Sequence, residues 1–146
     1  MQSIRLKPLH VTAQRKEDAA VQRYLERQQQ LQRHETRLAE LEAYLSEYSR
    51  PPARSQSGVQ LRMRREFIDR LRGIVRIEAN AVEQARAACE AERARWLLAH
   101  RSTEVLDKLG AHYRAHEARV EDRRLQRESD EIATQRWRVQ RSPPAS

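Results

Sequence analysis

The segment from Ser49 to Gly58 constrains the fold of this chain more than any other feature. It reads Ser-Arg-Pro-Pro-Ala-Arg-Ser-Gln-Ser-Gly. Pro51 and Pro52 have no amide hydrogen, and each disfavours a helical conformation in the residue before it. Gly58 is free to adopt a positive φ angle. No comparable break interrupts the chain on either side, so the sequence predicts two long helices folded back on each other.

Apolar residues recur every seven positions on both sides of this break, which is the spacing of a coiled-coil seam. Before the break the seam positions are Tyr24, Leu31, Leu38 and Leu45, with Leu41 and Tyr48 added close to it. After the break they are Leu61, Ile68, Val75, Val82, Cys89 and Trp96, joined by Leu71 and Ala85. Hydrophobic residues make up only 38% of the chain and charged residues 34%, which favours a narrow seam between helices over a compact core.

These patterns predict an all-α fold, a long antiparallel two-helix coiled-coil hairpin with an overhanging second helix. We expect one elongated domain over residues 1–146, with a helix over about 9–48, a turn over 49–58, a helix over about 59–140 and a disordered tail over 141–146. Pro8 is tolerated only at the start of a helix, and Thr12 is a candidate for the N-terminal cap of the first helix.

The two predicted helices differ in length. At 1.5 Å per residue the first is roughly 55 to 60 Å long and the second roughly 120 Å, so pairing between them should end near Ala99. Beyond that point the second helix keeps an apolar stripe with no predicted partner inside the chain. This stripe consists of Leu106, Leu109, Tyr113 and Val120. We therefore expect the overhang to bind another protein.

No motif indicates catalysis, a cofactor or a small-molecule substrate. His112 and His116 are one turn apart, but a metal site needs a third ligand and usually a fourth. Cys89, the single cysteine, takes a seam position with no histidine within a turn, which predicts packing rather than reactivity. No stretch reaches the roughly 20 apolar residues that span a bilayer, and the N-terminus lacks the apolar core of a secretory signal. We predict a soluble, cytoplasmic protein that is not an enzyme and holds no metal.

The chain is basic, with a formal net charge of +8 from 29 basic and 21 acidic residues. The excess is concentrated between Arg50 and Arg76, where eight arginines are accompanied by only two acids, Glu66 and Asp69. Such a stretch can bind nucleic acid, an acidic protein or an anionic membrane surface. Nucleic acid is not favoured, because 26 of the 29 basic residues are arginines spread through the chain among acidic residues.

More apolar side chains gather beside the break than a two-stranded seam requires. On the first helix the cluster covers more than one stripe, and its members are Leu41, Tyr44, Leu45 and Tyr48. On the second helix a row of Phe67, Leu71 and Ile74 runs beside a row of Ile68, Leu71 and Val75. Since each helix of such a seam needs one row, the surplus row would form an exposed apolar patch, which usually marks a binding site.

At these residues the sequence resembles the FliJ family of the flagellar type III export apparatus. The matching pattern is Leu38-x-x-Leu41-x-x-Tyr44-x-x-Glu47-Tyr48, then the break, then Phe67-Ile68-x-x-Leu71-x-x-Ile74. Downstream, the stretch from Leu106 to Tyr113, followed by Glu121-x-x-Arg124 and Asp130-Glu131-x-Ala133, is similar to the C-terminal helix of that family. The resemblance covers most of the chain.

The resemblance implies a long antiparallel α-hairpin that acts as a stalk. Its helix termini would enter the hexameric ring of the export ATPase (FliI), here through Leu106, Leu109, Tyr113 and Val120. A patch near the turn would contact the export gate (FlhA), here through Leu41, Tyr44, Tyr48, Phe67, Leu71 and Ile74. Two flanking positions of that patch are Arg37 and Glu78. The family also implies handling of export chaperones and a peripheral place at the cytoplasmic face of the inner membrane.

Two alternatives stay open on the sequence alone. One is the homologous stalk of a virulence type III secretion system. The other is a basic coiled-coil protein that binds nucleic acid. Co-purification with a hexameric ATPase would support a stalk, whereas a salt-dependent gel shift would support nucleic-acid binding.

Overall fold

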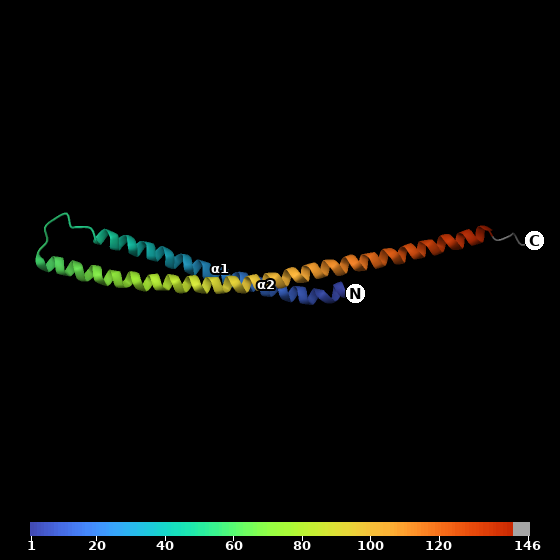
Figure 1. The fold of residues 1–146 in the computed structure, drawn as a ribbon, viewed down its shortest axis with the longest axis horizontal. Coiled ribbons are helices and arrows are strands. Elements are labelled where there is room, and N and C mark those ends of the chain that lie inside the picture. The colour runs from blue at the N-terminus through green and yellow to red at the C-terminus, as the bar shows by residue number, and fades with distance from the viewer. Residues whose placement is uncertain (142–146) are drawn as a thin grey trace, which may run out of the picture. The chain divides into compact units, whose positions relative to one another are not determined.

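The computed structural model describes residues 1–141 and contains two α-helices, α1 (Gln2–Tyr48, 47 residues) and α2 (Gly58–Arg141, 84 residues). No strand occurs in this part of the chain. Contacts between α1 and α2 run antiparallel, so the predicted all-α, two-helix hairpin is confirmed (Figure 1). The chain divides into a turn unit, Arg15–His100, and a terminal unit, which joins Met1–Gln14 to the chain from Arg101 onward.

A capping box starts α2. The amide of Gln60 donates to Ser57 Oγ (3.2 Å), and the amide of Ser57 donates to Gln60 Oε1 (3.0 Å). This reciprocal pair satisfies amide groups that have no partner at a helix N-terminus. Gly58 is already helical, and no residue among 1–141 has a positive φ angle. The conformational freedom expected of Gly58 is therefore not used.

The end of α1 is held from across the break. Arg64 Nη2 donates to the carbonyl oxygen of Tyr48 (2.6 Å) and to that of Arg50. Carbonyl groups in the last turn of a helix have no partner within the helix, so Arg64 supplies one. A guanidinium at this place also complements the negative end of the helix dipole.

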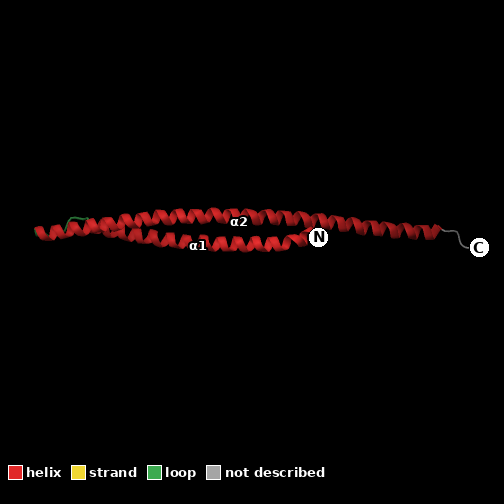
Figure 2. Cartoon of the chain, turned by 90° about the horizontal axis from the view of Figure 1, so that it is seen from below, coloured by secondary structure: helices red, strands yellow, loops and turns green. Residues whose placement is uncertain are grey.

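The seam of the turn unit is thin. Its buried hydrophobic residues are Ala20, Leu71, Val82 and Cys89. Within the turn unit α1 and α2 lie side by side in both views (Figures 1 and 2), and each side chain can pack only against the one facing helix. The burial of Cys89 confirms its predicted packing role.

Polar pairs between the helices add to this seam. His34 Nδ1 donates to Glu78 Oε1 (2.7 Å), and His100 Nδ1 donates to Glu17 Oε1 (2.7 Å). Glu78 is only 8% exposed, and a buried carboxylate needs such a donor to offset its desolvation. Between these two pairs, Arg23 approaches the buried Glu92, with Nε 3.5 Å from Oε2. The pairs fix which residues of α1 face which residues of α2.

The N-terminal end of α1 differs from the prediction. The helix begins at Gln2 rather than near residue 9, and Pro8 lies inside it. The missing amide of Pro8 removes a single helical hydrogen bond, which does not end the helix here. Thr12 is not an N-terminal cap, because it lies within the helix and its hydroxyl donates to the carbonyl oxygen of Pro8 (2.9 Å).

This longer α1 corrects the predicted end of pairing. In the terminal unit the Ser3 amide donates to Glu117 Oε1 (3.0 Å), and His10 contacts Asp107. The prediction that pairing stops near Ala99 is therefore wrong, because the first residues of the chain are helical and extend the pairing to Glu117. The overhang of α2 is correspondingly shorter. Arg141, placed in the predicted tail, is the last residue of α2, and residues 142–146 of that tail lie outside the described residues.

Candidate functional site

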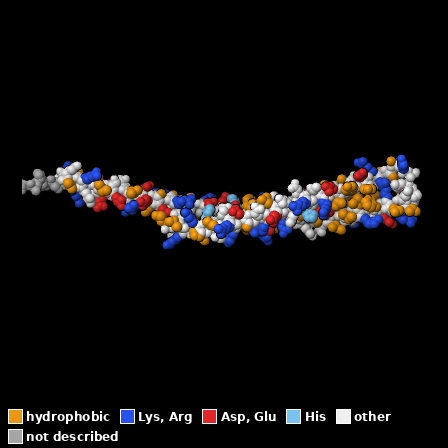
Figure 3. Space-filling view, turned by 180° about the vertical axis from the view of Figure 1, so that it is seen from behind, with side chains coloured by type: hydrophobic (Ala, Val, Ile, Leu, Met, Phe, Trp, Pro, Cys, Tyr) orange, Lys and Arg blue, Asp and Glu red, His pale blue; other side chains and the backbone are white. Residues whose placement is uncertain are grey.

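The apolar patch predicted beside the turn is largely on the surface. Tyr44 is 56% exposed, and Tyr48, Phe67 and Ile74 are also exposed. Tyr48 of α1 and Phe67 of α2 meet edge to face, with their ring centroids 4.9 Å apart. Figure 3 shows hydrophobic side chains gathered near the turn and bordered by basic ones. The turn unit therefore presents aromatic side chains from both helices on one surface.

The two leucines of the patch lie deeper. Leu41 is half-buried, and Leu71 is only 7% exposed. Leu71 therefore belongs to the seam and supports the exposed rings from beneath, rather than offering its own surface to a partner. Both predicted rows of α2 included Leu71, and its burial assigns it to the inner row.

A groove of about 530 Å³ lies beside these residues, on the side of the patch away from the turn. Its walls come from both helices and consist of Arg37, Glu40, Leu41, Tyr44, Ile74, Ile77 and Glu78. Ile77 was missed by sequence reasoning, although it follows Ile74 by one turn of helix and is well exposed. Glu78 places no free charge in the groove, because its carboxylate is buried against His34.

No metal-binding group and no membrane-spanning helix lies in the described part of the chain. Within residues 1–141 no group of three or more His, Cys, Asp or Glu side chains could hold a metal ion. His112 packs against the ring of Tyr113 at 6.0 Å between centroids. None of the helices in this part of the chain is both long enough and apolar enough to span a bilayer.

The predicted stripe of the overhang is split by the pairing in the terminal unit. Leu106 and Tyr113 are half-buried, and Leu106 lines a groove of about 430 Å³ together with Leu6 and Val11 of α1. Leu109 is 36% exposed, and Val120 is 50% exposed. Leu106 and Tyr113 are therefore partly covered within the terminal unit, while Leu109 and Val120 are open to a partner.

Every residue from Ala118 to Arg141 is exposed, and we call this part of α2 the exposed segment. Four of its apolar residues recur every seven positions, namely Ala118, Leu125, Ile132 and Val139. Sequence reasoning missed them because the seven-residue repeat of Leu106, Tyr113 and Val120 in the predicted stripe continues to Arg127 and Thr134, which are polar. Restarting the seven-residue repeat at Leu125, five residues after Val120, would have revealed them. Trp137 adds an exposed ring, with Arg141 Cζ 4.5 Å from its centroid.

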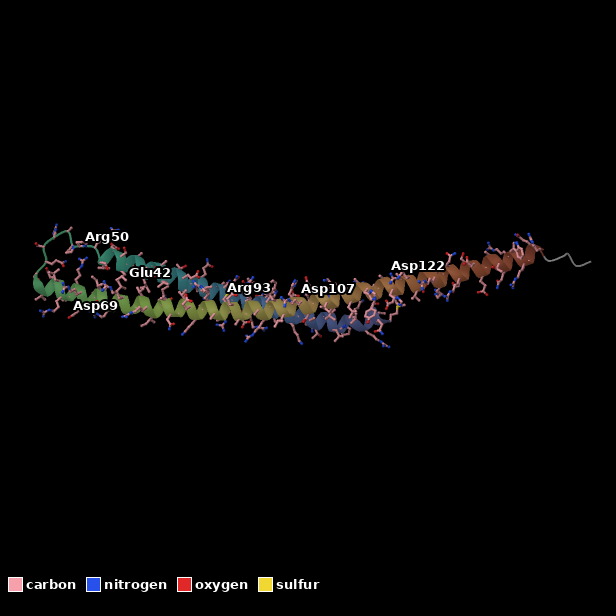
Figure 4. All side chains as sticks on the ribbon, viewed as in Figure 1. Glu42, Arg50, Asp69, Arg93, Asp107 and Asp122 are labelled. Carbon is pink, nitrogen blue, oxygen red and sulfur yellow. The ribbon has the colours of Figure 1, made fainter. Side chains whose placement is uncertain are left out.

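Local ion pairs stabilise the exposed segment as a helix. Arg124 contacts Glu121 (2.6 Å) three residues before it and Glu128 (2.7 Å) four residues after it. The guanidinium of Arg124 lowers the pKa of the Glu121 carboxyl. Such spacings join side chains on one face of a helix, so this face of the exposed segment is charged. Figure 4 labels Asp122 in this part of α2.

Glu117 stabilises the start of α1 from the opposite helix. Its carboxylate accepts hydrogen bonds from the hydroxyl and the amide of Ser3, and these bonds hold the pKa of Glu117 below its ordinary value. A negative charge beside the first amide groups of a helix also complements the helix dipole. Because the folded pKa is the lower one, this contribution is present above the unfolded pKa and is lost as the pH falls through the folded pKa.

We therefore expect Glu117→Gln to loosen the first turn of α1 at neutral pH. Amide hydrogen exchange at Ser3 and the residues after it should be faster than in the unmodified protein, and the difference should shrink in acid. Glu121→Gln is the matched control, since the pKa of Glu121 is also lowered but by Arg124. Equal exchange in both variants would contradict a role of Glu117 at this helix end.

The model of one protein family, described as the flagellar FliJ protein, matches residues 1–142 of the chain. No curated protein and no solved structure matches the chain.

Proposed function

The chain belongs to the FliJ family of flagellar type III export proteins, and we propose that it works there as a non-enzymatic stalk. One part would bind the export ATPase, and another would bind the membrane export gate. We further propose that it assists export chaperones and resides in the cytoplasm, at the inner face of the inner membrane. The family match favours the flagellar system over a virulence system.

The observation that supports this proposal is that each unit exposes apolar side chains that its own seam does not use. In the turn unit these are the rings of Tyr44, Tyr48 and Phe67 beside a groove. Large aromatic side chains often supply much of the binding energy of a protein interface. We therefore assign the apolar patch to the export gate, with Leu41 and Leu71 as its support and Ile74 at its edge.

In the terminal unit the exposed segment offers a different kind of surface. A single helix with a narrow apolar stripe is typical of a helix that docks into a groove or between other helices. We assign this segment, which includes Val120, to the export ATPase. Of the earlier candidates, Leu106 and Tyr113 would then pack toward α1 rather than provide most of the contact, and Leu109 would stay exposed beside them.

A reconstitution with purified components tests the proposal. The full chain should bind the hexameric export ATPase and raise its rate of ATP hydrolysis, and it should bind the cytoplasmic part of the export gate in a separate assay. A gel shift at the same ionic strength tests the nucleic-acid alternative. Failure to bind either export component, combined with tight binding to nucleic acid, would contradict the stalk.

A further inference from the structure

The turn between the helices carries a concentration of unopposed positive charge. Residues 49–65, which we call the arginine tip, contain five arginines and no acidic residue, and the nearest acids in the sequence are Glu47 and Glu66. One of the five, Arg64, donates to the backbone at the end of α1. The other four are exposed, and they are Arg50, Arg54, Arg62 and Arg65. Figure 4 shows Arg50 at the turn.

Some other arginines of the turn unit have acidic partners on the same helix. Arg86 pairs with Glu83 (2.6 Å) and Arg95 pairs with Glu92 (2.8 Å), each at a spacing of three residues. Among the four exposed arginines of the tip, only Arg50 has an acid three residues before it, Glu47, and Arg50 lies beyond the end of α1. Within the described part of the chain none of these four takes part in an ion pair. Their charge is available to a partner.

Exposed apolar side chains accompany this charge. Val59 is 66% exposed and Met63 is 63% exposed, and a spacing of four residues places both on one face of α2. Leu61 lies nearby and is also exposed. Nucleic acid would satisfy the arginines but would give the aliphatic side chains little to contact. A membrane surface satisfies both, because anionic headgroups attract guanidinium groups and the acyl boundary accepts apolar side chains.

We propose that the arginine tip docks on an anionic lipid bilayer. The lipids would be recognised through their phosphate groups by Arg50, Arg54, Arg62 and Arg65, and Val59 and Met63 would enter the headgroup layer. A fluid surface needs no matching groove, which agrees with the irregular, exposed turn. The proposal goes beyond the assignment of the apolar patch to the export gate, and it uses different side chains.

Binding of the full chain to vesicles tests the proposal. One set contains phosphatidylcholine alone, and the other also contains phosphatidylglycerol as the anionic lipid. We expect binding to the anionic set, weakened by added salt, and little binding to the neutral set. A tip variant removes four charges through Arg50→Gln, Arg54→Gln, Arg62→Gln and Arg65→Gln. At about fivefold per arginine, its affinity for anionic vesicles should fall by about a few hundredfold.

A control variant removes the same number of charges from exposed arginines of the terminal unit, by Arg119→Gln, Arg123→Gln, Arg127→Gln and Arg136→Gln. It should keep its affinity within about fivefold. Val59→Ser with Met63→Ser should weaken binding about tenfold without changing the net charge. Thermal melts monitored by circular dichroism establish that each variant is folded.

Three results would overturn the proposal. Equal losses in the tip and control variants would mean that net charge alone drives adsorption. Tighter binding of the tip to duplex DNA than to anionic vesicles at the same salt would identify nucleic acid as the partner. A tip variant that keeps vesicle binding but loses the export gate would identify an acidic protein surface. The vesicles contain no export component, so their outcome is independent of the stalk proposal.

Discussion

Phe67→Ala is expected to weaken binding to the export gate by about thirtyfold while lowering the free energy of unfolding by only about 1 kcal/mol. The first effect corresponds to about 2 kcal/mol, which is typical of a central aromatic residue in an interface. The second is small because the ring is exposed and loses mainly its edge-to-face contact with Tyr48, a contact worth about 0.5 to 1.5 kcal/mol. Tyr48→Ala should behave in the same way. Titration with the gate's cytoplasmic part and thermal melts measure the two quantities.

Leu71→Ala is the matched control in the same patch. Leu71 is buried, so its truncation should lower the free energy of unfolding by about 2 to 5 kcal/mol. All these variants should still stimulate the export ATPase when they are folded, because the patch and the exposed segment belong to different units. If Phe67→Ala melts as low as Leu71→Ala, the ring is part of the core and the patch assignment is wrong.

The double variant Leu125→Asp and Ile132→Asp is expected to abolish stimulation of the export ATPase and to leave the protein folded. Both side chains lie in the exposed segment, where substitutions usually change stability by no more than about 0.5 kcal/mol each. The acidic side chains would interrupt the apolar stripe that we assign to the ATPase. Rates of ATP hydrolysis with increasing amounts of each variant measure the effect.

Leu106→Asp separates packing from binding within the same helix. Leu106 is half-buried against the start of α1, so this variant should destabilise the terminal unit by about 1 to 3 kcal/mol. Val120→Asp should behave like the double variant, because Val120 is exposed. Full stimulation by the folded Leu125→Asp and Ile132→Asp variant would mean that the ATPase binds elsewhere.

The sequence predicts the fold well where the cause is local. Two adjacent prolines require a break, and a seven-residue repeat of apolar residues requires a seam, so the two helices and the packing of Cys89 follow from the chain alone. The start of α1 does not follow. It depends on Glu117, which is far away in the sequence and reaches Ser3 only after the helices have paired.

The candidate surfaces are predicted only in part for a similar reason. The row Phe67, Leu71 and Ile74 is visible in the sequence, but which of its members turns inward depends on how α2 is rotated against α1. The repeat of Leu125, Ile132 and Val139 is also present in the sequence. It is easily overlooked because it does not continue the seven-residue repeat of Leu106, Tyr113 and Val120, but starts again five residues after Val120.

The carboxylate pairs across the seam have a mechanical consequence. Sliding α1 along α2 by one heptad, about 10 Å, would place the buried Glu78 opposite Leu41 instead of His34 and leave its charge without a donor. This slip removes a hydrogen bond from a carboxylate that is shielded from water, which is strongly unfavourable. The turn unit therefore resists sliding in this direction, and a pull applied to one helix that way would be transmitted to the other rather than lost as sliding between them.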